Sequence, residues 1–473
     1  MTSQIEEGAP ARPLARLRRE LGVLESYAAL IGILVGAGIF RVTSTAYAST
    51  GASVILGYLV LAPAVLATSV AYIVFLSTPL GREPGAEYAH IAAVFGGRRV
   101  AFLGAWLKLV SYTGACAFLA VALADYLVEL EHMLGGTLDP AAARAPLALA
   151  SLVLFWAVHA IGVRWFGRVQ VAMCAVLGVS IVVLVVPGLF AIESDFYRPF
   201  FAHGREGFFA ALPPLFFAYA GFESLAHTAG EVQDSTKTLP RVFVRGIALT
   251  TLVFVSMSAV ALGVLPAERI AANPTPMAEA AAVYLPFGPA ALVTLGAVMA
   301  VATSLNASVY VPSRLMLVLA RDGHLPNWLG RVELRTGTPI VGLSVTLAGA
   351  AALVLAGQIG LALTIAVLAL VLLYALHSLG LLLLPRANPA LFAEVTARVP
   401  LAWQRCAALV SLVSMLVLVA SQLVPDARHV LSTSLPERWR ADSLTSLELL
   451  LAWTAVGLLV HALRPGSSRG ESS

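Results

Sequence analysis

Charged side chains are scarce in this sequence. Asp, Glu, Lys and Arg make up 12% of the 473 residues, whereas 59% are hydrophobic. Soluble domains carry about 25% charged residues, so half that proportion indicates that lipid is the main solvent of the folded chain. Length alone would suggest about three soluble domains. The shortage of charge predicts one helical membrane bundle instead.

Other signals are also missing. The three cysteines, Cys116, Cys174 and Cys406, lie in or beside apolar runs without metal-ligand spacing, which is typical of small buried hydrophobic residues. Residues 1–25 are polar and basic, and the apolar run after them lacks a cleavage pattern, so we expect a cytoplasmic N-terminal arm. The net charge is +4, but basic residues do not cluster with aromatics, so no nucleic-acid partner is expected.

Long apolar runs, by contrast, are abundant. Dividing the chain at charges and at Pro and Gly clusters gives twelve predicted spans, enough to cross a bilayer twelve times. The least distinct division falls near Gly360, where Gln358 and Gly360 interrupt one long apolar stretch. The predicted spans are residues 26–48, 52–77, 100–128, 147–162, 168–191, 208–228, 242–265, 289–319, 339–357, 361–384, 403–424 and 445–463.

The distribution of Lys and Arg predicts the orientation. With the N-terminus placed in the cytoplasm, 20 of the 30 Lys and Arg residues fall in inside segments and 7 in outside loops. Cytoplasmic loops carry such an excess of positive charge. We therefore expect a multi-pass protein of the plasma (cytoplasmic) membrane with both termini cytoplasmic and an even number of spans.

Glycine is concentrated in the first span, which reads LIGILVGAGIF over residues 30–40. Three glycines in seven residues are unfavourable in a helix that must satisfy its own backbone in lipid. A break around residues 36–38 would turn amide N–H groups and the positive end of a half-helix toward a carboxylate. Gly32 and Gly36 also form a GxxxG pair for close helix packing, so this motif alone leaves both interpretations open.

The sixth span has a similar interruption. It reads PPLFFAYAGFES over residues 213–224, with small residues from Ala218 to Gly221. Interrupted spans in corresponding positions of two inverted halves indicate a transporter site, although a kinked structural helix is the alternative. Glu223 is the only acid in this span. Because an unpaired buried carboxylate is unfavourable, we expect a structural or gating hydrogen bond there, with proton carriage as the alternative.

Four stretches carry a resemblance to a known family. They are GILVGAGIF (32–40), GREPGAEYAHIAAVFG (81–96), FFAYAGFESLAHTAGEVQDSTKTLPR (216–241) and SLNASVYVPSRLMLVLARDGHLPNWLGRVELRTGTPIVGL (304–343). In this order and spacing, residues 25–385 resemble the amino acid–polyamine–organocation superfamily of permeases.

The resemblance implies an all-α membrane fold of the LeuT type. This fold has a five-plus-five inverted repeat, broken first and sixth spans, and two further helices. The implied divisions are 1–25 for the cytoplasmic arm, 26–191 and 208–384 for the two repeats, 403–463 for the two additional spans, and 464–473 for a cytoplasmic tail.

The resemblance also implies a substrate site. In the family, the first-span glycine motif binds the substrate carboxylate, and carbonyls of both broken helices bind the α-amine. The ring of Phe217 would then cover the substrate as a gate. Carried over, the carboxylate faces Gly36, Ala37 and Gly38, and the amine faces the carbonyls of Leu34, Phe217 and Ala220, with Tyr219 beside them.

One departure from the family concerns ion coupling. Many relatives carry a lysine in the fifth span, about nine residues after an arginine like Arg168, where it takes the place of a sodium ion. Here Leu177 or Gly178 occupies that position. Thr303 and Ser304 are candidate sodium ligands with first-span carbonyls, although small hydroxyl residues also serve packing. The coupling ion, H⁺ or Na⁺, stays open.

Charged residues within spans are further candidates. Lys108 in the third span is expected either to snorkel to the cytoplasmic face or to supply a charge in the transport path. Arg314, with Asp322 and Glu231, is a candidate cytoplasmic gate, because such pairs must break when an inward path opens. The histidines within spans, expected to be satisfied packing residues, are His159, His227 and His377.

These observations predict secondary active transport of an amino acid by alternating access. The expected pocket walls, near Phe217, Ser111, Tyr112 and Cys116, lack a buried acid for a cationic side chain, which favours a neutral or apolar amino acid. The alternatives are a polyamine or organic-cation carrier, and a non-transporting amino-acid sensor. No Ser-His-Asp order, phosphate loop or metal cluster is evident, so neither an enzyme, a cofactor nor a bound metal is expected.

Overall fold

The computed structural model describes residues 19–36, 38–82, 85–270, 273, 275–436 and 444–463. The predicted arm before residue 19, Ala37 of the predicted carboxylate site, and the predicted tail 464–473 lie outside the described residues. Within them every regular element is a helix, and one isolated parallel bridge joins Leu21 to Val232.

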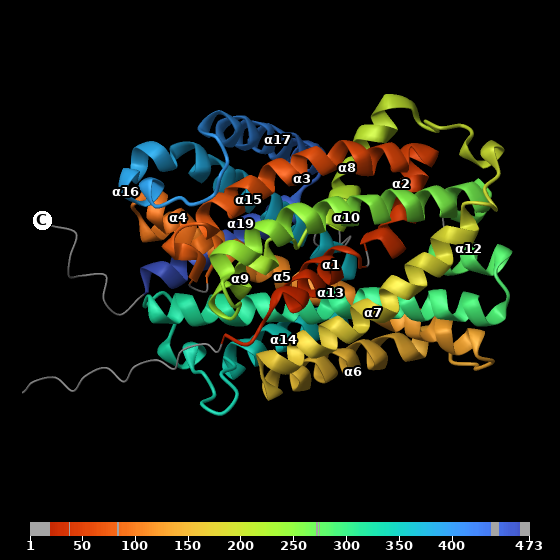
Figure 1. Cartoon of the computed structure of the whole chain (residues 1–473), viewed down its shortest axis with the longest axis horizontal. Coiled ribbons are helices and arrows are strands. Elements are labelled where there is room, and N and C mark those ends of the chain that lie inside the picture. Colours follow the sequence, from red (N-terminus) through yellow and green to blue (C-terminus); the bar gives the residue numbers. More distant parts are fainter. Residues whose placement is uncertain are drawn as a thin grey trace, which may run out of the picture.

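The helices follow the apolar runs of the sequence (Figure 1). In chain order they are α1 (Val23–Leu34), η1 (Gly38–Val42), α2 (Thr43–Thr50), η2 (Gly51–Ser53), α3 (Val54–Leu76), η3 (Pro79–Arg82), α4 (Glu87–Phe95), α5 (Arg98–Met133), α6 (Pro140–Ile161), α7 (Val163–Gly188), η4 (Ser194–Tyr197), α8 (Gly204–Tyr219), α9 (Ser224–His227), η5 (Thr228–Gly230), α10 (Ser235–Val264), α11 (Ala267–Ile270), α12 (Pro276–Tyr284), α13 (Phe287–Arg321), η6 (Asn327–Gly330), α14 (Ile340–Leu355), α15 (Ile359–Ala387), α16 (Pro389–Ala393), α17 (Leu401–Ser432) and α19 (Ser446–Ala462).

Ten segments of the described chain are long and apolar enough to cross a membrane, and α14 and α19 are shorter apolar helices. The chain is therefore an all-α, multi-pass membrane protein. The predicted division near Gly360 falls slightly earlier in the structure, because α14 ends at Leu355 and Gly357 makes the turn with φ of +71°. That backbone conformation favours glycine, and Gly360 itself lies inside α15.

The bundle has an enclosed centre and a lipid-facing perimeter. In Figure 1 the long helices run along the same axis, with α6 and α7 on one side, α17 on the opposite side, and α1, α5 and α13 between them. Most of the apolar stretch of α5 and of α13 is buried, whereas α6, α7 and α17 bury only a minority of theirs. Apolar side chains such as Leu154, Val182 and Val413 point outward there, as expected where lipid replaces water.

Two helices are interrupted near the centre of the bundle. Helix α1 ends at Leu34, and the next described helical segment begins at Gly38. Helix α8 ends at Tyr219, Ala220 is extended with φ of −67° and ψ of 146°, and Gly221 has φ of +101°. The two interruptions touch, because a Cβ atom built on Gly38 would lie 2.3 Å from the Cα atom of Ala218. Backbone from two distant parts of the chain therefore meets inside the bundle.

The last helix, α19, is attached to the bundle by a tryptophan pair. The Nε1–H of Trp106 donates to the Trp453 carbonyl and that of Trp453 to the Trp106 carbonyl, both at 2.8 Å, and the rings stack with centroids 4.6 Å apart. We expect Trp453→Phe to destabilise the protein by about 1 kcal/mol through loss of one hydrogen bond. The unfolding midpoint in detergent measures this effect. Trp403→Phe, in a side chain that is 69% exposed on α17, is the control and should leave the midpoint unchanged.

Candidate functional site

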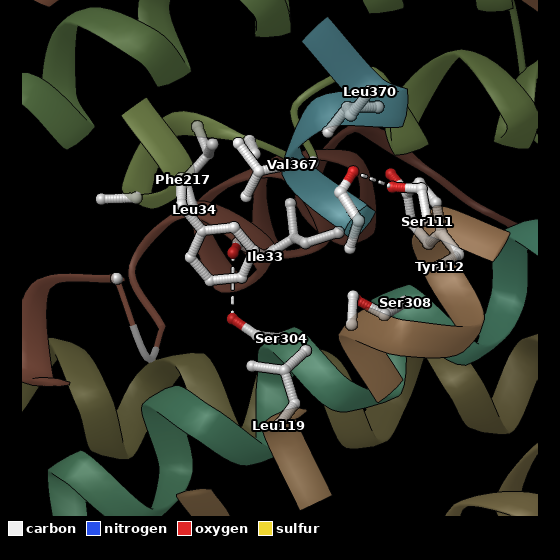
Figure 2. Close-up of a pocket in the computed structure, with 16 residues that line it drawn as sticks. Ile33, Leu34, Ser111, Tyr112, Leu119, Phe217, Ser304, Ser308, Val367 and Leu370 are labelled. Atoms are coloured by element: carbon white, nitrogen blue, oxygen red, sulfur yellow. Dashed lines mark hydrogen bonds between the residues drawn. The ribbon is translucent and has the colours of Figure 1, made fainter. Parts of the chain in front are cut away.

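A pocket lies where the two interruptions meet α5, α13 and α15 (Figure 2). Figure 2 shows the ring of Phe217 beside Leu34, with Ser304 and Ser308 across the pocket. None of the lining residues is Asp, Glu, Lys or Arg. The lining consists of Ile33, Leu34, Gly38, Ser111, Tyr112, Ala115, Leu119, Phe217, Ala218, Ala220, Gly221, Ser304, Ser308, Ala366, Val367 and Leu370.

One side of the pocket is closed by a carboxylate held between two tyrosines. The Tyr112 hydroxyl donates to Glu223 Oε1 at 2.5 Å, and the Tyr374 hydroxyl donates to Glu223 Oε2. Glu223 Oε2 also accepts from the Gly221 amide at 3.0 Å. The fully buried carboxylate thereby satisfies an N–H group that the interrupted helix leaves without a helical partner. Helices α5 and α15 are joined through it to the segment before α9.

A buried ion cluster continues from Glu223 toward α4. Lys108 Nζ lies 2.6 Å from Glu87 Oε1 and 3.6 Å from Glu223 Oε1, and His227 Nε2 lies 3.0 Å from Glu87 Oε2. Burial alone would raise the pKa of the Glu87 carboxyl, but the Lys108 ammonium and the His227 ring hold that pKa well below its ordinary value. Lys108 is 1% exposed, so it does not snorkel to a surface.

Aromatic rings lie on the other side of the pocket. The rings of Phe217 and Phe118 meet edge to face, with centroids 5.5 Å apart. Nearby, the Tyr126 hydroxyl donates to the Phe40 carbonyl at 2.6 Å and ties α5 to the segment after the first interruption. Phe217 is only half-buried, whereas Glu223 is fully buried.

The predicted substrate-binding residues fall into two groups. Leu34, Gly38, Phe217 and Ala220 line the pocket, whereas Gly36, Tyr219 and the predicted wall residue Cys116 do not. A Cβ atom on Gly36 would lie 1.7 Å from Ser304 Oγ, so this glycine lets α13 approach the backbone of the first interruption.

Tyr219 corrects an expectation from the sequence. Its hydroxyl donates to the Tyr58 carbonyl and to Thr251 Oγ1, each at 3.1 Å, so its ring packs between α3 and α10 instead of facing the pocket. The physical reason is that a buried tyrosine hydroxyl needs a partner, and the partners lie on the outer side of α8.

The candidate sodium ligands bond directly to α1. Thr303 Oγ1 donates to the Gly32 carbonyl at 2.8 Å, and Ser304 Oγ donates to the Ile33 carbonyl at 2.9 Å. Deeper in the same interface, Gln170 donates to the carbonyls of Ala28 and Thr303, each at 3.2 Å. The first-span carbonyls that would ligate a cation thus already accept hydrogen bonds from side chains.

The predicted gate pair forms in part. Arg314 Nη2 lies 3.2 Å from Glu231 Oε1, with both side chains 1% exposed, and the guanidinium lies 3.8 Å from the Tyr310 ring centroid. Asp322 instead accepts from the Tyr88 hydroxyl at 2.5 Å, and no contact between Asp322 and Arg314 is recorded among the described residues. The pair therefore joins α13 to the segment after α9, without Asp322.

Sequence reasoning missed several residues of this region. Tyr374 lies in an apolar run without any motif, and Glu87 lies in a loop motif that gave no hint of burial. His227 was expected to be a packing residue, but it bonds to Glu87. One signal was available: the only lysine inside a predicted span, Lys108, requires a buried acidic partner unless it reaches a surface.

The fold and the pocket together describe a multi-pass helical membrane protein with a pocket at two interrupted helices, whose described lining has no Asp, Glu, Lys or Arg. A family model described as "Amino acid permease" matches residues 21–437, and the chain belongs to this family. The resemblance to the amino acid–polyamine–organocation superfamily is thereby confirmed, and this family is one of transport proteins.

Individual relatives are 27–28% identical to this chain over the residues that align. A branched-chain amino acid permease of Bacillus subtilis is 27% identical over 338 residues, covering 69% of this chain and 72% of that protein. The Asc-type amino acid transporter 1 of Mus musculus is 28% identical over 392 residues, or 79% and 72%. The chloroplastic cationic amino acid transporter 9 of Arabidopsis thaliana is 28% identical over 335 residues, or 67% and 58%.

Proposed function

We propose that the chain carries a neutral amino acid with an apolar side chain across the plasma membrane by alternating access. The observation that carries this proposal is the pocket itself. Two interrupted helices supply backbone groups there, and the described lining contains no Asp, Glu, Lys or Arg. Backbone amides at a helix start suit a carboxylate, and carbonyls at a helix end suit an ammonium. The rest of the substrate then meets apolar and small side chains.

In this proposal the amino acid carboxylate binds near Gly38. Its α-amine binds carbonyl oxygens of Leu34, Phe217 and Ala220. Its side chain extends toward Ala115, and the other apolar residues there are Leu119, Val367 and Leu370. One relative is named for branched-chain amino acids, which agrees with an apolar wall.

A cationic side chain fits this pocket poorly. Glu223 is the acid beside it, but its oxygens already accept hydrogen bonds from Tyr112, Tyr374 and the Gly221 amide. A polyamine or a cationic amino acid would have to displace these donors and would leave their polar groups buried without partners. The name of the plant relative therefore does not set the substrate class proposed here.

Two contacts on opposite sides of the pocket support alternating access. The Phe217–Phe118 contact closes one side, and the Tyr112–Glu223–Tyr374 group closes the other. We assign the second side to the cytoplasm, with both termini inside, because Lys and Arg are concentrated in the segments at that end. Opening either closure while keeping the other would expose the site to one compartment at a time. In the proposed five-plus-five inverted repeat, α1 and α8 would occupy equivalent positions for such a movement.

Counterflow into proteoliposomes tests the proposal. Vesicles with purified protein are loaded with unlabelled L-leucine or L-alanine, and labelled amino acid is added outside. Saturable exchange of L-leucine or L-alanine is expected, with little exchange of L-lysine or putrescine. Exchange confined to L-lysine or putrescine would move the assignment to a cation carrier. Binding of L-leucine without any exchange would indicate a sensor instead.

A further inference from the structure

The cluster between the pocket and α4 holds an unusual set of buried titratable groups. Glu87 and Glu223 carry two negative charges, and Lys108 carries one positive charge, all at most 1% exposed. With the imidazoles neutral, the fixed charge of the cluster is therefore −1. A net charge in a low-dielectric interior is strongly unfavourable, so the cluster favours uptake of one further positive charge.

The hydrogen bond of His227 shows where a proton would bind. The Glu87 carboxylate can only accept, so at 3.0 Å the His227 Nε2 must carry the hydrogen and donate to Glu87 Oε2. In the neutral ring, Nδ1 then holds a lone pair. Nδ1 is buried and has no hydrogen-bond partner among the described residues. This nitrogen is free to accept a proton, and the resulting imidazolium would make the cluster neutral.

Polar contacts connect His227 to the pocket wall. The hydroxyl of Tyr112, which lines the pocket, donates to Glu223. Lys108 Nζ lies 3.6 Å from Glu223 Oε1 and 2.6 Å from Glu87 Oε1. Glu87 is in turn the hydrogen-bond partner of His227. Several of the elements around the cluster contribute titratable groups. They are Tyr72 from α3, Glu87 and His90 from α4, Lys108 and Tyr112 from α5, Glu223 before α9, and Tyr374 and His377 from α15.

We propose that His227, which is paired with Glu87 beside Lys108, binds one proton in the closed state and releases it once in each transport cycle. This inference rests on the proposed transport function and names its coupling ion. Glu223 and His227 both follow the interruption at Gly221, and His227 ends α9. A movement of α9 away from α4 and α5 would therefore separate His227 from Glu87. Water could then reach Nδ1 and accept its proton. The lone pair stays on Nδ1, and the ring becomes neutral again.

The alternative ion is disfavoured by the same structure. The α1 carbonyls near Thr303 and Ser304 already accept hydrogen bonds from both hydroxyls, and Gln170 occupies the adjacent carbonyl of Ala28. Lys108, by contrast, already lies within the cluster that contains His227, 2.6 Å from Glu87 Oε1.

Proton movement measured beside counterflow tests the inference. Wild-type proteoliposomes containing pyranine are given L-leucine or L-alanine without an imposed gradient. Acidification of the lumen that depends on substrate is expected. His227→Gln keeps a donor for Glu87 but cannot take a proton, and Glu87→Gln makes the cluster neutral without a proton. Both variants should retain counterflow and lose the proton signal.

His90→Gln is the matched control, because His90 is an equally buried imidazole that bonds to His377 at 3.0 Å instead of to a carboxylate. It should keep both signals. Wild-type counterflow without proton movement overturns the inference and leaves the transport function standing, whereas absence of counterflow contradicts the transport function. A proton signal that survives in both Gln variants, or is lost only in His90→Gln, also overturns it. If a variant folds but shows no counterflow, proton uptake is measured instead when substrate is added to the purified variant in detergent. Loss of this uptake in His227→Gln and Glu87→Gln supports the inference, and its persistence overturns it.

Discussion

Replacing Gly38 by alanine is expected to abolish amino acid uptake. A Cβ atom at this position would lie 2.3 Å from the Cα atom of Ala218 and 2.5 Å from its Cβ atom. Because the contact is with backbone, no side-chain rotation can relieve it, and the two interrupted segments would have to separate. The proposed carboxylate and amine contacts span these two segments. Losing two hydrogen bonds to charged groups, at about 1.5–3 kcal/mol each, would weaken substrate binding by about 100-fold or more.

Gly178→Ala provides the control for this experiment. Gly178 lies in the membrane helix α7, and no atom outside its own helix would come within 4 Å of an added Cβ. Its counterflow should match that of the wild type, and its binding should be unchanged. Equilibrium binding of labelled L-leucine in detergent, beside counterflow, separates loss of the site from loss of movement. Normal binding in Gly38→Ala would show that the substrate does not bridge the two segments.

The location of this site could be predicted because its signals are local. Glycine is costly in a membrane helix that must satisfy its own backbone. A glycine run such as 32–38, or an isolated Gly221 beside small residues, therefore marks a special backbone position in the sequence itself. Long apolar runs likewise predict spans without knowledge of neighbours. The helices therefore fall where these patterns indicated. Leu34, Gly38, Phe217 and Ala220, which the family resemblance implied, line the pocket.

The partners across helices could not be predicted in the same way. Lys108 and Glu87 are 21 residues apart and Tyr112 and Glu223 are 111 apart, and neither separation follows a helical period. Which way a side chain points also depends on neighbours, as Tyr219 shows by bonding to Tyr58 instead of lining the pocket. Hydrogen-bond requirements of buried groups decide these contacts, and they become visible only when the helices are packed together.

Removing the charge of Arg314 should strongly destabilise the protein. Arg314 and Glu231 are each 1% exposed, and the Nε atom of Arg314 and Oε2 of Glu231 have no further partner among the described residues. Truncating one member of a buried ion pair leaves the other charge uncompensated and costs about 3–5 kcal/mol. Arg314→Met keeps most of the side-chain volume, so its lower unfolding midpoint would report the unpaired Glu231.

The double variant Arg314→Met/Glu231→Gln separates stability from gating. Replacing both charges removes the unpaired group, so most of the lost stability should return. If the pair also acts as a gate, counterflow in the double variant should still differ from wild type, because α13 and the segment after α9 would no longer be held together by charge. Arg314→Glu/Glu231→Arg should restore the attraction and the wild-type rate. A wild-type rate of counterflow in Arg314→Met would show that breaking this ion pair does not limit transport. The closure at Glu223 would then remain as the proposed cytoplasmic gate.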